Sequence, residues 1–277
     1  MTPLQAVSLG HAADVQSTAA GTVHSVFTHA VNLEIRGDLW TLLAADRADL
    51  PFGIRVACAS FDALALRRAD PVHVKAGFVG LGEGRRDLVV DCRATPRWIV
   101  ARGARRTAGF TRRLEAVAAA ARARAWPGSA RMANQAALAL HDPRALGNAL
   151  RRVVGCGPGA TPAGDDVLVG ICAVLRSPYS GGAGASAADA LWRCARPLLS
   201  TTSDISAHLL RQAANGLPSR SVHELICTLI GAAAPGQFEE SLRRVVQTGA
   251  TSGADLCLGV VAAARTFLLN HQERAAA

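Results

Sequence analysis

The segment GCGPGATPAGDDVLVG, residues Gly155 to Gly170, lies between two helical patterns and decides how the second half of the chain is interpreted. Its first glycines permit positive φ and let the backbone come close to a ligand. Thr161 and Pro162 then stiffen the entry to a helix whose first turn holds Asp165 and Asp166. The free N–H groups and the dipole of a helix start favour bound anions. The segment therefore predicts a binding site for a small anion.

The two adjacent carboxylates need an explanation, because they would repel a phosphate bound there. One explanation is a divalent cation such as Mg²⁺ held by Asp165 and Asp166. A second is that one carboxylate handles a proton while the other caps the helix, which makes both of them candidate catalytic residues. A third is that they only cap the helix and favour its dipole. A cap needs one or two special residues, whereas GCGPGATP has seven, every residue except Ala160. We therefore favour a site.

Two familiar phosphate-binding motifs are excluded by the same segment. It has no lysine, so it is not a Walker A loop. A helical pattern rather than a strand precedes it, so it is not a dinucleotide fingerprint.

A second segment, GATSGADLCLGV from Gly249 to Val260, repeats the first in miniature. In both, a Gly/Thr turn leads into a helix, and an aspartate is followed four residues later by a glycine: Asp166 and Gly170, then Asp255 and Gly259. Between the two segments, hydroxyls crowd a third helix start in TTSDIS. A solvated capping cluster is the alternative there. We expect both aspartate-bearing helix starts to converge on one ligand. The candidate substrate-binding residues are Gly157, Gly159, Thr161, Thr202, Ser206, Thr251 and Ser252.

The patterning predicts an α+β chain with two domains. Residues 1–105 read as a β-rich domain, a small sandwich or a partly closed barrel, because short segments such as Val31 to Ile35 alternate. The stretch from Phe78 to Cys92 has the pattern of a hairpin. Residues 106–277 read as a bundle of about seven helices that carries the glycine-rich segment.

Capping and loop signals refine the helical half. Asp142 followed by Pro143 is a strong helix start, and Ser221 with Glu224 has the spacing of a capping box. The segment from Ser177 to Asp189 has the composition of a surface loop.

Composition excludes several classes of protein. The net charge is +9, and Lys75 is the only lysine among 30 basic residues. The arginines are spread along the chain without interleaved aromatic residues, so we expect no nucleic-acid partner. No run of eighteen apolar residues is free of polar breaks, and the N-terminus has no basic leader. We expect a cytoplasmic protein of bacterial type with no membrane partner. The seven cysteines form no C-x-x-C pair, which argues against a disulfide framework or structural zinc.

The central segment resembles the G-x-G-x-G-x-T-P-x-G-D-D signature of a bacterial domain family that includes the AllH subunit of oxamate carbamoyltransferase. TTSDISAHLLRQAANG and GATSGADLCLGV resemble its later motifs, and VHSVFTHAVNL resembles its N-terminal one. Ala160 stands where leucine is common in the family. The resemblance implies a role in carbamoyl transfer in purine-derived nitrogen metabolism. It also implies carbamoyl phosphate and oxamate as substrates, and work beside other enzyme subunits.

The leading hypothesis is therefore a carbamoyltransferase-type enzyme, or one subunit of it, that binds a small anionic substrate such as carbamoyl phosphate at helix N-termini. A non-catalytic metabolite-binding or scaffold subunit is the alternative from another class. A metal-dependent hydrolase of an amide or ureido compound is a third. The sequence indicates no cofactor other than the Mg²⁺ that could explain the two aspartates. It is compatible with a homo-oligomer.

Overall fold

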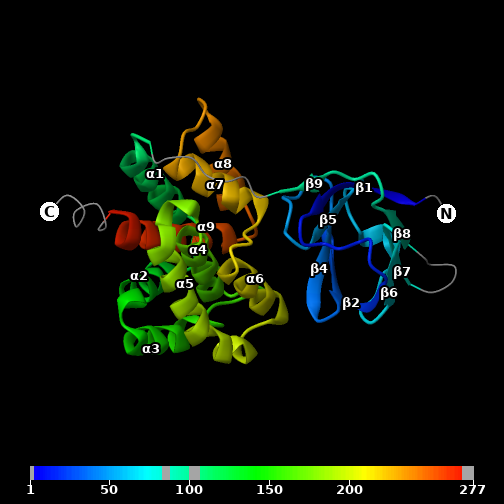
Figure 1. Ribbon diagram of the computed structural model, residues 1–277, viewed down its shortest axis with the longest axis horizontal. Coiled ribbons are helices and arrows are strands. Elements are labelled where there is room, and N and C mark those ends of the chain that lie inside the picture. Colours follow the sequence, from blue (N-terminus) through cyan, green and yellow to red (C-terminus); the bar gives the residue numbers. More distant parts are fainter. Residues whose placement is uncertain (1–2, 83–87, 100–106, 270–277) are drawn as a thin grey trace. The chain divides into compact units, whose positions relative to one another are not determined.

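The chain divides into two compact units, Met1–Val100 and Ala101–Ala277. The computed structural model describes residues 3–82, 88–99 and 107–269. The first unit is built of strands and the second of helices (Figure 1). The predicted α+β class is confirmed.

The first unit is a closed barrel. Its described residues form a nine-stranded sheet in the order β5-β4-β3-β2-β6-β7-β8-β1-β9, and a further pairing of β1 with β5 closes the first eight of these strands. Closure goes beyond the predicted sandwich or partly closed barrel, because it requires β1 to pair with two strands far along the chain. The strands span Leu4–Gly10 (β1), Ala19–Phe27 (β2), Ala30–Ile35 (β3), Asp38–Leu43 (β4), Gly53–Val56 (β5), Pro71–Lys75 (β6), Phe78–Leu81 (β7), Leu88–Asp91 (β8) and Arg97–Trp98 (β9).

Alternating side chains fill the barrel. Val31, Leu33 and Ile35 of β3 are buried in its core, while Glu34 between them is exposed. The predicted hairpin is confirmed as the antiparallel pair β7 and β8. Residues 83–87 of its turn lie outside the described part of the chain.

The second unit is a helical bundle around α4 and α9, which Figure 1 labels next to each other in its middle. These two helices are buried along nearly their whole length. The described residues of this unit contain nine α-helices rather than about seven. They span Phe110–Arg122 (α1), Ser129–Leu138 (α2), Pro143–Val153 (α3), Ala163–Leu175 (α4), Gly181–Ala195 (α5), Asp204–Ala214 (α6), Arg220–Ile230 (α7), Gln237–Val246 (α8) and Ser252–Ala263 (α9).

The predicted loop from Ser177 to Asp189 is wrong, because most of it is helical. A short 3₁₀ turn, Pro178–Ser180, leads directly into α5. Gly184 explains the difference: a Cβ there would lie 2.5 Å from the Leu175 carbonyl oxygen, so only glycine lets α5 pack this closely against the end of α4. Small residues that look like loop composition are here packing residues, and tertiary contacts override their low helix propensity.

Of the two predicted helix caps, Asp142 before α3 is confirmed, and Ser221 before α7 is wrong. Asp142 caps α3 as predicted, because its Oδ1 accepts from the backbone N–H of Arg144 at 2.8 Å. The cap of α7 is Ser219 and not Ser221. Ser221 already lies in the first turn, so Glu224 pairs with Arg220 at 2.8 Å instead of closing a capping box.

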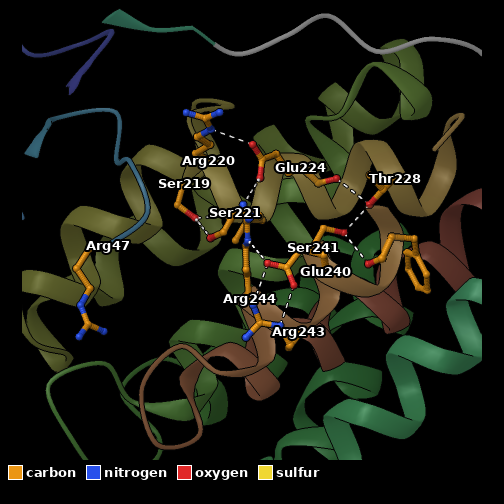
Figure 2. A network of polar contacts seen from close by, with 12 residues as sticks. Arg47, Ser219, Arg220, Ser221, Glu224, Thr228, Glu240, Ser241, Arg243 and Arg244 are labelled. Atoms are coloured by element: carbon orange, nitrogen blue, oxygen red, sulfur yellow. Dashed lines mark hydrogen bonds and ion pairs between the residues drawn. The ribbon is translucent and has the colours of Figure 1, made fainter. Parts of the chain in front are cut away.

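Polar contacts join α7 to α8 (Figure 2). Arg244 lies 2.7 Å from Glu240 on its own helix and 3.7 Å from Glu224 on α7. These side chains are half-exposed, so their ion pairs contribute little. The hydrogen bond between the Thr228 and Ser241 hydroxyls, at 2.7 Å, is buried and carries more of the contact. It fixes α8, which precedes the turn into α9.

One helical segment, Ser252–Leu269, is long and apolar enough to cross a membrane by length and composition. Within this structure 72% of it is buried, as expected of a core helix.

Candidate functional site

The glycine-rich turn between α3 and α4 depends on glycine for two different reasons. Gly155, Gly157 and Gly159 have φ of 74°, 119° and 93°, in the left-handed region that other residues rarely adopt. At Gly155 there is also no room, because a Cβ would lie 2.4 Å from the Thr201 carbonyl oxygen. Around Gly159 nothing lies within 4 Å of a Cβ position, and the residue is exposed. The turn is packed at its start and open at its tip.

Asp165 holds this turn against the start of α6. Its Oδ1 accepts from the Gly155 N–H at 2.9 Å, and its Oδ2 accepts from the Thr202 hydroxyl. Burial raises the pKa of Asp165, and hydrogen bonds from Thr202, Gly155 and Ser206 oppose that rise. Asp165 is 1% exposed. Each of its oxygens accepts a hydrogen bond from the protein, so the side chain positions the turn against the start of α6.

Asp166 has a different environment, although it is the next residue. Burial raises the pKa of Asp166 to about 8; the Ser252 hydroxyl opposes this, and the charges of Asp255 and Asp165 add to it. Thr161 also hydrogen-bonds the carboxyl. Its Oδ2 is buried and has no hydrogen-bond partner among the described residues. At neutral pH this side chain is a protonated acid.

Asp255 occupies the equivalent place on α9. It is fully buried, and its Oδ1 accepts from the backbone N–H of Trp126 in the turn between α1 and α2, at 2.8 Å. Like Asp166, it has an Oδ2 that is buried without a partner in the part of the chain that the structure describes. Asp255 was not among the predicted site residues, although the repeat of Asp166-x-x-x-Gly170 in Asp255-x-x-x-Gly259 already pointed to it.

The helix starts of α4, α6 and α9 meet at these carboxyl groups. The Thr161 and Ser252 hydroxyls lie 2.9 Å apart and join the turn before α4 to the first residue of α9. The Ser203 hydroxyl donates to the Ala160 carbonyl oxygen at 2.5 Å and joins the same turn to α6. Thr251 is the N-cap of α9, but its side chain makes no capping hydrogen bond. Of the predicted substrate-binding residues, the structure brings Thr161, Thr202, Ser206 and Ser252 to the aspartates; Gly159 is exposed at the tip of the turn.

The repeated glycines let α4 and α9 approach each other closely. A Cβ on Gly170 would lie 2.0 Å from the Leu256 carbonyl oxygen, and a Cβ on Gly259 would lie 2.0 Å from the Val167 carbonyl oxygen. The two contacts are reciprocal, since Val167 follows Asp166 just as Leu256 follows Asp255. The internal repeat of the sequence is therefore also a repeat in space, because the same contact is made from α4 to α9 and from α9 to α4.

Comparison with known families agrees with the predicted resemblance. Residues 153–264, which contain all three helix starts, match the family described as "Oxamate carbamoyltransferase subunit AllH". Residues 5–97 match the AllH family N-terminal domain. The chain belongs to the AllH family. No curated protein and no solved structure matches it.

Mg²⁺ is one explanation of the two adjacent acids that the sequence offers. Mg²⁺ takes near-octahedral oxygen ligands. Both oxygens of Asp165 already accept hydrogen bonds from Gly155 and Thr202. Among the described residues, no group of three or more His, Cys, Asp or Glu side chains is placed to hold a metal ion. The site offers Mg²⁺ few open ligands, and Asp165 and Asp166 as its ligands stay a prediction.

The chemistry that remains is hydrogen bonding to an anion or carbonyl oxygen. Three helix starts bring partial positive charge to one place, and hydroxyls lie beside them, although several first-turn N–H groups already donate within the chain. The neighbouring acids do not cancel this charge to the extent that the sequence suggests. Asp165 is stabilised by hydrogen bonds from Gly155 and Thr202, and Asp166 is protonated at neutral pH, so it adds no negative charge.

Proposed function

We propose that this AllH family chain is the anion-binding subunit of a carbamoyltransferase, and that the meeting point of α4, α6 and α9 binds carbamoyl phosphate or its acceptor. The observation that carries the proposal is the 2.9 Å contact between the Thr161 and Ser252 hydroxyls, which joins two helix starts that are far apart in the sequence. Because partial positive charges lie together there, an anion stabilises the arrangement.

The reaction expected from the family description requires little covalent chemistry from the protein. The amide nitrogen of oxamate attacks the carbonyl carbon of carbamoyl phosphate, the bond from that carbon to the phosphate oxygen breaks, and phosphate leaves. The nitrogen loses a proton, and the products are oxalurate and phosphate. The protein must hold the phosphate and stabilise the developing charge on the carbonyl oxygen. Backbone N–H groups and the hydroxyls of Thr161 and Ser252 are suited to both tasks.

A non-catalytic, metabolite-binding subunit is the second candidate, and one observation favours it. Both oxygens of Asp165 are engaged in hydrogen bonds and Asp166 holds a proton at neutral pH, so neither is a ready base for the attacking nitrogen. In that case a partner subunit supplies the base, and the isolated chain binds without turnover.

The first test is the thermal stability of the purified chain with carbamoyl phosphate, oxamate, oxalurate, phosphate and ADP, each with Mg²⁺ or with EDTA. We expect a rise in the unfolding temperature with at least one small anion, equal in both conditions. The double variant Thr161→Val/Ser252→Ala should lose that rise. The matched control Thr111→Val/Ser186→Ala removes hydroxyls from the exposed faces of α1 and α5 and should keep it. No rise with any anion in the folded wild-type chain would contradict the proposal.

Turnover separates the candidates. Phosphate release from carbamoyl phosphate that depends on oxamate identifies a transferase, and release only after a partner subunit is added identifies a binding subunit. Ammonia release from oxalurate without phosphate would identify a hydrolase instead.

A further inference from the structure

Two buried carboxyl oxygens without a partner lie at the same place in the two halves of the repeat. They are Oδ2 of Asp166 on α4 and Oδ2 of Asp255 on α9, and both lie in the described part of the chain. The side chains are 6% and 0% exposed. A buried polar atom without a hydrogen bond is costly, so each such atom in a native protein needs an explanation. The observation needs a ligand or a proton to account for it.

The surroundings of Asp166 favour a proton. The charges that act on it most are those of Asp255 and Asp165, both negative, and no basic side chain is among the causes of its pKa shift. The titratable residues on elements that pack against α4 are Arg131 on α2, Tyr179, Asp189, Arg193 and Cys194 on or before α5, Asp204, His208 and Arg211 on α6, Arg220, His223, Glu224 and Cys227 on α7, and Asp255 and Cys257 on α9. All the arginines in this set are exposed.

A buried carboxylic acid brings a new requirement, because its O–H is a donor that needs an acceptor. The Thr161 and Ser252 hydroxyls hydrogen-bond the Asp166 carboxyl, so the acid lies where the α4 and α9 starts meet. Any acceptor that binds at this meeting point can take the O–H.

We infer that Asp166 works as a neutral acid, whose Oδ2–H donates to an oxygen of the anion bound at the α4 and α9 starts. This inference rests on the proposed function. It explains how an anion can bind beside three aspartates. Asp165 and Asp255 accept hydrogen bonds from the protein, and Asp166 changes from a repelling charge to a donor. The site then selects ligands that present an acceptor oxygen, and it disfavours those that present only N–H groups.

The affinity of the site for an anion should fall at high pH. Below a pH of about 8 the acid keeps its proton and the affinity for an anion is constant. Above that pH the proton must be taken up on binding, so the dissociation constant rises about tenfold for each pH unit. Oxamate is a suitable probe because neither of its groups titrates in this range, and sulfate reports on generic anion binding.

The experiment is calorimetric titration of the full chain with oxamate and with sulfate at pH 6.5 and 9.5. We expect wild-type affinity to fall roughly tenfold or more between the two. Asp166→Asn should bind equally at both, because the amide N–H also donates. Asp166→Ala should bind weakly at both. Asp142→Asn, at the exposed cap of α3, should behave as the wild type.

The outcomes distinguish this inference from the proposed function. Equal wild-type affinity at both pH values would leave the anion site standing and overturn the inference. Absence of binding of either anion at both pH values, in folded protein, would overturn both. An infrared carbonyl band of a protonated carboxyl, present in the wild type at pH 6.5 and missing in Asp166→Asn, is the second expected result.

Discussion

Three aspartates with similar sequence surroundings have three different environments. Asp165 accepts one hydrogen bond on each oxygen, from Gly155 and from Thr202. Asp166 is protonated at neutral pH, and Asp255 accepts from the backbone N–H of Trp126. The type of residue is the same in each, so burial and the available donors decide the chemistry. Asp165 and Asp166 contact the glycine-rich turn, Asp255 contacts the turn between α1 and α2, and together they hold the helix starts in place.

Replacing Asp165 should destabilise the protein more than removing an ordinary helix cap. Asp165→Ala leaves the Gly155 N–H and the Thr202 hydroxyl without their acceptor, which costs roughly 3 kcal/mol of unfolding free energy. Asp142→Ala, the comparison, removes an exposed cap and costs about 1 kcal/mol. Urea denaturation of both variants measures the difference. Equal losses would show that the contacts of Asp165 are not structural.

Asp166→Asn should change how stability depends on pH. The pKa of Asp166 is about 8 in the folded chain and about 4 in an unfolded one. Between these values the folded state holds a proton that the unfolded state releases, so the unfolding free energy falls as pH rises from about 4 to about 8. Asparagine does not titrate, so the variant should lose this part of the slope and gain stability relative to the wild type towards pH 8. Denaturation at pH 5 and pH 8 tests this, and parallel slopes for the two proteins would contradict it.

At the scale of elements, the contact between α4 and α9 depends on two glycines that the sequence alone ranks as helix-weakening residues. Each removes a Cβ that would lie 2.0 Å from a carbonyl oxygen of the other helix. The close approach brings Asp166 and Asp255, one turn earlier on each helix, to the same place. The packing of the two helices therefore positions the acids.

Gly170→Ala and Gly259→Ala should each destabilise the helical unit by about 2 kcal/mol or more, because the helices must separate. Gly147→Ala in α3 is the matched control: the nearest atom to its Cβ position is the end of the Arg151 side chain at 4.0 Å. There alanine should stabilise the helix by about 0.5–1 kcal/mol. Thermal unfolding of the three variants measures these changes. The unfolding temperature should fall in Gly170→Ala and Gly259→Ala and rise in Gly147→Ala; a change in the same direction in all three would contradict the packing argument.

Local signals predicted much of this architecture, and most of the failures have one cause. The cap at Asp142, the β7–β8 pair and the Asp166/Asp255 repeat depend on residues close in sequence. Barrel closure depends on β1 meeting β5 and β8, and the helix α5 depends on Gly184 meeting the end of α4. The bond from Trp126 to Asp255 spans 129 residues. Contacts between distant segments leave no local pattern, so the sequence pointed to the acids without revealing what each one binds.

At the scale of the whole molecule, each unit has its own apolar core. The barrel core is made of side chains from its own strands and loops, such as Leu33 and Leu42. The helical core is made of residues from Phe110 onwards. The acids and hydroxyls of the candidate site all belong to the helical unit. Anion binding should therefore stabilise that unit and not the barrel.

A substitution in the barrel core tests this separation. Leu42 is fully buried, and Leu42→Ala should cost about 2–5 kcal/mol. In scanning calorimetry it should lower one unfolding transition and leave unchanged both the second transition and its rise with oxamate. Leu150→Ala, at a fully buried position of α3, is the matched change in the helical core and should lower the oxamate-dependent transition. If Leu42→Ala lowers both transitions equally, the two cores unfold together, and the barrel contributes to the stability of the anion site.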